Sequence, residues 1–88
     1  MAKQAETVSS SFVKSSPLVE KNLGSVVVMK EISAGRVHGS ANEWKVEYSV
    51  IGKKARGSVY VSVQKTKGNW NVPSAQLVET GGKSVNLL

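Results

Sequence analysis

The stretch YSVIGKKARGSVYVSV, residues 48–63, decides the fold of this 88-residue chain. Its two halves alternate apolar and polar residues with a period of two, the pattern typical of β-strands that bury one face. Glycines flank a short turn between the halves, so the sequence predicts a β-hairpin. The turn residues Lys53, Lys54 and Arg56 pose the main functional question. They either bind an anionic partner or keep the edge of a sheet soluble.

The strict alternation assigns the side chains of this hairpin to two faces, beginning at Glu43. The apolar face is predicted to hold Trp44, Val46, Tyr48, Val50, Val59, Val61 and Val63. The outer face is predicted to hold Lys45, Glu47, Tyr60 and Gln64 among its exposed side chains.

Three further strands are predicted on either side of the hairpin. SVVVMKEIS (25–33) precedes it, WNVPSAQLVE (70–79) follows a KGN turn, and KSVNLL (83–88) follows a GG turn. In the segment 70–79 the apolar positions shift by one residue across Pro73. Proline has no amide proton to donate to the sheet and is tolerated in β-bulges, so a bulge is expected there.

The first 24 residues carry helical spacing instead. Apolar residues recur three, four and seven positions apart, and Ser16, Pro17 and Gly24 supply a cap, a first turn and a stop. We expect a helix, a break near residues 15–17 and a second short helix. Residues 1–7 are predicted to be a tail, either disordered or of artificial origin. Residues 8–88 then form a single α+β domain, in which an N-terminal helix or broken helix packs on one face of a five-stranded antiparallel meander sheet.

The inventory of reactive side chains is thin. The chain has no cysteine and no aspartate, and His38 is its single histidine. Glu43 and Glu47 share a strand face but lie about 13–14 Å apart, too far for a paired-carboxylate mechanism. The sequence therefore predicts a noncatalytic protein that holds no metal and no cofactor.

The net charge of +6 raises the expectation of an anionic partner. A meander places consecutive turns at opposite ends of a sheet, so the basic turn at 53–56 and Lys65 and Lys67 are separated. Nucleic acid is not expected as a partner, because proteins that bind it usually present one continuous basic stripe with exposed aromatic side chains. A small basic domain that binds nucleic acid or an anionic surface remains the alternative. The longest apolar run, Val26–Met29, is far shorter than the ~20 residues of a membrane helix.

The order of SPLVEKNLG (16–24), the hairpin at 48–63 and KGNWNVPSAQLVE (67–79) resembles the cytochrome oxidase complex assembly protein 1 family. The resemblance implies a membrane-tethered domain outside the cytoplasm, in the mitochondrial intermembrane space or on the bacterial periplasmic side. It also implies a role in early steps of respiratory-complex assembly and a fold shared with a presequence translocase subunit. No catalytic residues are expected from the resemblance. This chain departs from the family because no transmembrane segment precedes Ser9.

We therefore expect a noncatalytic adaptor whose partners are proteins, such as respiratory-complex subunits or assembly intermediates, with an anionic membrane surface as a further partner. The residues expected to bind a protein partner are Lys45, Glu47, Lys53, Lys54, Arg56, Tyr60 and Gln64. An exposed strand edge, either Val26–Ile32 or Val85–Leu88, is a further candidate because it can accept a partner's strand.

Overall fold

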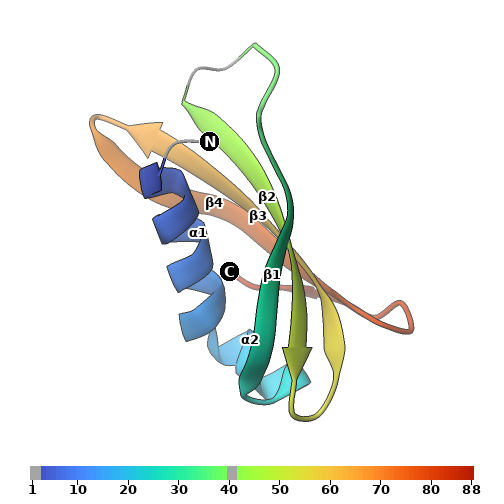
Figure 1. Ribbon diagram of the computed structural model, residues 1–88. Coiled ribbons are helices and arrows are strands. Elements are labelled where there is room, and N and C mark those ends of the chain that lie inside the picture. Colours follow the sequence, from blue (N-terminus) through green and yellow to red (C-terminus); the bar gives the residue numbers. More distant parts are fainter. Residues whose placement is uncertain (1–2, 40–41) are drawn as a thin grey trace.

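The structure, a computed structural model, describes residues 3–39 and 42–88. Within these residues two helices precede five strands, which form one antiparallel sheet in the order β1-β2-β3-β4-β5. The elements are α1 (Lys3–Ser15), α2 (Pro17–Leu23), β1 (Val26–Arg36), β2 (Glu43–Gly52), β3 (Arg56–Thr66), β4 (Asn69–Glu79) and β5 (Ser84–Asn86). Both helices lie on the same face of a twisted sheet (Figure 1). The predicted α+β architecture is confirmed.

The predicted helix break lies at Ser16. This residue has an extended backbone (φ −70°, ψ 119°), and its Oγ accepts a hydrogen bond from the Val19 amide at 3.3 Å. Pro17 occupies the first position of α2, where the missing amide proton costs nothing. Gly24 ends α2 with φ 81°, a left-handed conformation that favours glycine. The sequence therefore fixes the elbow between α1 and α2 locally.

The start of α1 differs from the expectation of a tail over residues 1–7. Helix α1 begins at Lys3, and Ala5 in its first turn is fully buried against the sheet. Gln4 Oε1 accepts a hydrogen bond of 3.1 Å from Trp70 Nε1 of β4. The first turn is held by a small side chain and a long-range hydrogen bond, neither of which produces a hydrophobic periodicity. Residues 1–2 lie outside the described part of the chain.

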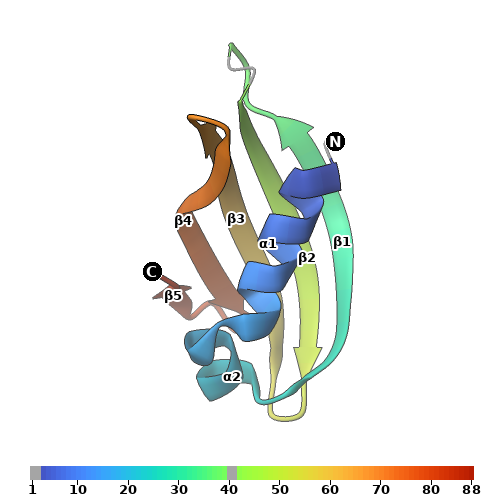
Figure 2. The same ribbon diagram turned by 90° about the vertical axis from the view of Figure 1, so that its left-hand side faces the viewer.

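The core lies between the helices and the covered face of the sheet, as the alternation predicts. Helix α1 crosses this face diagonally and leaves β1 to one side (Figure 2). All the predicted inward valines are buried, and Trp44 and Trp70 are half-buried at the margin. The main buried hydrophobic residues are Val13, Val19, Leu23, Val46, Tyr48, Val50, Val59, Val61, Val63 and Leu77.

A buried hydroxyl pair joins α1 to β2. Tyr48 Oη and Ser9 Oγ lie 2.7 Å apart, and Ser9 Oγ also lies 3.1 Å from the Glu6 carbonyl, to which it can donate. Burial raises the pKa of Tyr48 above its ordinary value of 10.0, and the Glu31 and Glu6 carboxylates add to the shift, whereas the bond to Ser9 opposes it. The pair therefore satisfies two polar groups that would otherwise be buried without a partner.

The predicted bulge in β4 is confirmed. Ser74 pairs with Ser62 and Asn71 pairs with Gln64, so Val72 and Pro73 together oppose Val63. The extra residue accounts for the slip of the apolar face along β4.

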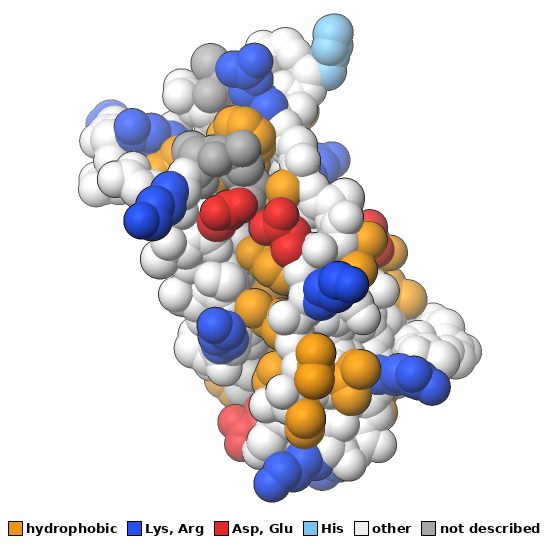
Figure 3. All heavy atoms as spheres, in the orientation of Figure 1, with side chains coloured by type: hydrophobic (Ala, Val, Ile, Leu, Met, Phe, Trp, Pro, Cys, Tyr) orange, Lys and Arg blue, Asp and Glu red, His pale blue; other side chains and the backbone are white. Residues whose placement is uncertain are grey.

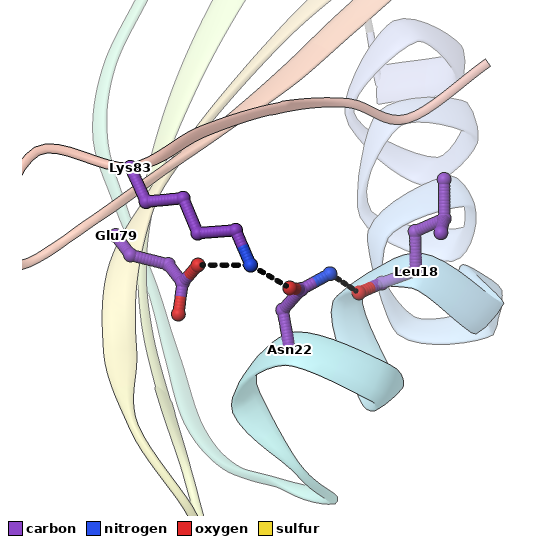
Figure 4. A network of polar contacts seen from close by, with 4 residues as sticks. All are labelled: Leu18, Asn22, Glu79 and Lys83. Atoms are coloured by element: carbon purple, nitrogen blue, oxygen red, sulfur yellow. Dashed lines mark hydrogen bonds and ion pairs between the residues drawn. The ribbon is translucent and has the colours of Figure 1, made fainter.

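Polar contacts bind α2 to the turn between β4 and β5 (Figure 4). Lys83 Nζ donates to Asn22 Oδ1 at 3.3 Å and lies 3.8 Å from Glu79 Oε2. Asn22 Nδ2 in turn donates to the Leu18 carbonyl at 2.7 Å. These contacts hold the short second helix against the far end of the sheet.

Candidate functional site

The outer face of the sheet is left uncovered by the helices, and one cross-strand row runs across all of its described strands. Register places the members of this row side by side, each on a different strand. We call it the Tyr60 row, and it consists of Ser33, Glu47, Tyr60, Gln76 and Asn86. A second row beside it contains Lys45, Ser62 and Ser74.

These two rows line a hollow of about 550 Å³ on the outer face. The buried residues Val46, Val61 and Ala75 also border it. Tyr60, at the middle of the row, is 45% exposed. Its large side chain is surrounded by the small side chains of serines. The hollow thus presents one large aromatic side chain among hydroxyl, amide and charged groups.

This composition suits protein recognition better than catalysis. Tyrosine supplies a rigid amphipathic contact at low entropic cost, and serine and asparagine supply adaptable hydrogen bonds. No three His or Glu side chains within residues 3–39 and 42–88 come together so as to hold a metal ion. His38 is exposed in the connector between β1 and β2, away from the hollow.

The structure brings together only some of the residues that the sequence suggested. Lys45, Glu47 and Tyr60 line the hollow, and Gln64 lies on the same face of β3 beyond it. The members that sequence reasoning missed are Ser33, Ser62, Ser74, Gln76 and Asn86. Alternation alone could have added Ser62, but the bulge in β4 and the weak pattern of the first and last strands concealed the others.

The basic turn has a structural role that the sequence did not reveal. The amides of Lys54 and Ala55 donate to the Leu23 carbonyl at 2.9 and 3.2 Å, and the Lys53 amide donates to the Ser25 carbonyl at 3.0 Å. The Leu23 carbonyl is at the end of α2, where carbonyls lack intrahelical partners and carry partial negative charge, so the turn satisfies it and brings cations near. Lys53, Lys54 and Arg56 are exposed and do not line the hollow.

Neither candidate edge offers a long, regular template for strand addition. In β1 the register shifts at Val27 and at Ile32, which leaves a short regular stretch between two bulges. Such bulges are a common protection of edge strands. At the other edge β5 is three residues long, and the Leu87 amide already donates to the Ala75 carbonyl. The outer face is therefore a better candidate for docking than either edge.

Comparison with known proteins assigns a family. The model of the family described as cytochrome oxidase complex assembly protein 1 matches residues 2–88. Searches of curated proteins and of solved structures gave no significant match. The chain belongs to this family, and membership indicates a role in cytochrome oxidase assembly and contact with respiratory-complex components. Families of such assembly factors are generally noncatalytic. The family is associated with assembly at the mitochondrial inner membrane, and none of the described helices is long and apolar enough to cross a membrane.

Proposed function

We propose that this member of the cytochrome oxidase complex assembly protein 1 family is a noncatalytic adaptor that binds a protein component of the assembling oxidase on its outer sheet face. The hollow around Tyr60 is the observation that carries the proposal. An exposed tyrosine among small polar side chains is a typical anchor for a protein partner, because tyrosine is enriched among the residues that dominate binding energy.

The rigidity of the face supports this role. The Tyr60 row is built on paired strands, whose backbones are fixed by the sheet, so binding orders few additional main-chain groups. Serine side chains also lose little conformational freedom when they are buried, whereas lysine and glutamate lose more. The partner is a respiratory-complex subunit or an assembly intermediate.

The proposal also includes tethering. In its functional form the domain acts at a membrane, with the outer face outside the cytoplasm, in the intermembrane space or on the periplasmic side. The association of the family with the inner membrane supports this arrangement. The excess of basic residues supports steering toward acidic partners, since opposite charges accelerate encounter. An affinity that is unchanged between low and high ionic strength would refute steering.

The experiment that tests the docking role replaces Tyr60 with a photoreactive phenylalanine derivative in cells that assemble the oxidase. The matched control carries the same derivative at Lys67, which is exposed in the turn after β3. Cross-linking to a subunit or intermediate of the oxidase is expected from position 60 and not from position 67.

A functional readout accompanies the cross-linking. Tyr60→Ala is expected to weaken the complex about tenfold or more, the loss typical of an aromatic anchor, and to lower the amount of assembled oxidase on native gels. Because Tyr60 is 45% exposed, Tyr60→Ala should lower the urea midpoint by no more than about 1 M, the cost in strand propensity, and should leave the domain folded. Normal assembly by Tyr60→Ala together with equal cross-linking from both positions would refute the docking role.

A further inference from the structure

One corner of the sheet, at the start of β1 and the end of β2, exposes aliphatic side chains that the core does not use. Val27, Val28 and Ile51 are 59%, 49% and 40% exposed. Register pairs Val28 directly with Ile51 on the outer face. Val27, the extra residue of the adjacent bulge in β1, lies at the edge of the sheet and also borders the hollow between β1 and the helices. We call these three residues the aliphatic corner.

Cationic side chains frame the aliphatic corner. Arg56 pairs with Ile51 across β2 and β3, and Lys30 pairs with Ser49 in the neighbouring row. Lys53 and Lys54 follow in the turn beyond Ile51. Figure 3 shows the result as an exposed hydrophobic cluster low on this side of the molecule, with Lys and Arg side chains around it.

The fold does not require this combination. The backbone of the basic turn caps α2 through its amides, which any residue other than proline would supply. Edge protection needs one or two charges and does not call for exposed valine and isoleucine beside them. Aliphatic side chains surrounded by long cationic ones are instead characteristic of surfaces that sit at a membrane interface.

We propose that the aliphatic corner docks on an anionic lipid bilayer. Val27, Val28 and Ile51 enter the headgroup region, and Lys30, Lys53, Lys54 and Arg56 lie against the lipid phosphates. Charge complementarity selects this occupant. A protein partner is disfavoured because the corner has no aromatic anchor and no convergent hydrogen-bonding groups, which protein interfaces usually concentrate at their centre. The proposal is independent of protein docking at the Tyr60 row.

Vesicle flotation tests the proposal with the whole chain. The domain is expected to bind vesicles of phosphatidylcholine mixed with phosphatidylglycerol, in a salt-sensitive manner, and not vesicles of phosphatidylcholine alone. Each basic residue near an anionic surface contributes about a fivefold gain in partitioning. Lys53→Gln/Lys54→Gln should therefore lower the partition coefficient about 25-fold.

Matched variants separate a specific site from general charge. Lys65→Gln/Lys67→Gln also removes two positive charges, but from the opposite end of β3. This variant should lower partitioning about twofold at most, because the Debye length is short at physiological salt. Val28→Thr/Ile51→Thr keeps every charge and the β-branched shape, yet should lower partitioning about tenfold through the lost apolar surface. Tyr60→Ala should leave vesicle binding unchanged, which separates this site from the docking face.

Four results would each overturn the proposal. They are absence of binding to the anionic vesicles, equal losses for the two lysine pairs, full binding by Val28→Thr/Ile51→Thr, and tighter binding to an acidic peptide such as polyglutamate than to the vesicles. All positions that are changed are exposed, so circular dichroism should give wild-type spectra for every variant.

Discussion

Gly52→Ala is expected to break the joint between α2 and the β2–β3 hairpin. A Cβ atom on Gly52 would overlap the Leu23 carbonyl oxygen and would lie 2.7 Å from the Leu23 carbonyl carbon. Both obstacles are backbone atoms, which cannot rotate out of the way. The hairpin must therefore move away from α2 and stretch the three hydrogen bonds that the amides of Lys53, Lys54 and Ala55 donate.

The expected cost combines two terms. Overpacking a closely fitted site costs about 1–3 kcal/mol, and each of the stretched hydrogen bonds contributes about 1 kcal/mol. Their partial loss gives a total of about 3–5 kcal/mol. A domain of this length is stable by roughly 4–13 kcal/mol, so the substitution should remove a large share of that stability.

Urea denaturation followed by tryptophan fluorescence and circular dichroism measures the loss. With a slope of about 1 kcal/mol per molar urea, the midpoint should fall by about 3–5 M or the native baseline should disappear. Gly35→Ala is the matched control, because a Cβ there meets no atom within 4 Å and neither glycine has a positive φ. A Gly52→Ala midpoint equal to that of Gly35→Ala would refute the packing of the basic turn on α2.

Two further substitutions test the contacts of the helices. Tyr48→Phe removes the hydroxyl that pairs with Ser9 and should lower the free energy of unfolding by about 1–2 kcal/mol in urea titrations. Because burial raises the pKa of Tyr48, the folded state holds this proton more tightly, so wild-type stability should fall as the pH rises above about 10, and Tyr48→Phe should lack that component. Ser16→Ala removes the cap of α2 and should cost about 1 kcal/mol, whereas Ser15→Ala, which changes only a hydroxyl bonded within α1, should cost less.

Local signals predicted most of the architecture. The elbow at Ser16 follows from a capping side chain and a proline within two residues, and the bulge in β4 follows from one slipped apolar face at Pro73. Each of these features is decided by neighbours in sequence. The hairpin at 48–63 was equally local, because its two strands pair across a short turn.

Long-range contacts account for what the sequence could not predict. The capping of α2 by the basic turn joins Leu23 to Lys54, which are far apart in the chain, through backbone atoms that carry no sequence signal. The hollow depends on the relative register of all the described strands, and two bulges in β1 set which of its residues face outward. Periodicity within one strand cannot give the register between strands.

The serines of the outer face are the residues that stability explains least. Strands favour threonine, valine and aromatic residues. Serines nevertheless occupy the rows on both sides of the Tyr60 row, Ser49 and Ser58 on one side and Ser62 and Ser74 on the other. Because these side chains are small, the Tyr60 side chain projects above the surrounding surface of the sheet and is available for contact with a partner. Such a choice costs strand propensity and is useful when a second surface covers the face.

The geometry relates the two proposed sites to each other. Glu47 of the Tyr60 row and Ile51 of the aliphatic corner lie on the same face of β2, four residues apart, which corresponds to about 13 Å along a strand. A domain that rests on a bilayer through Ile51 would therefore hold Tyr60 within about that distance of the headgroups. At that height the proposed docking face would meet segments of a protein partner that emerge next to the lipid. The two sites are then best understood as one oriented surface, in which the lipid contact sets the height at which the protein partner is met.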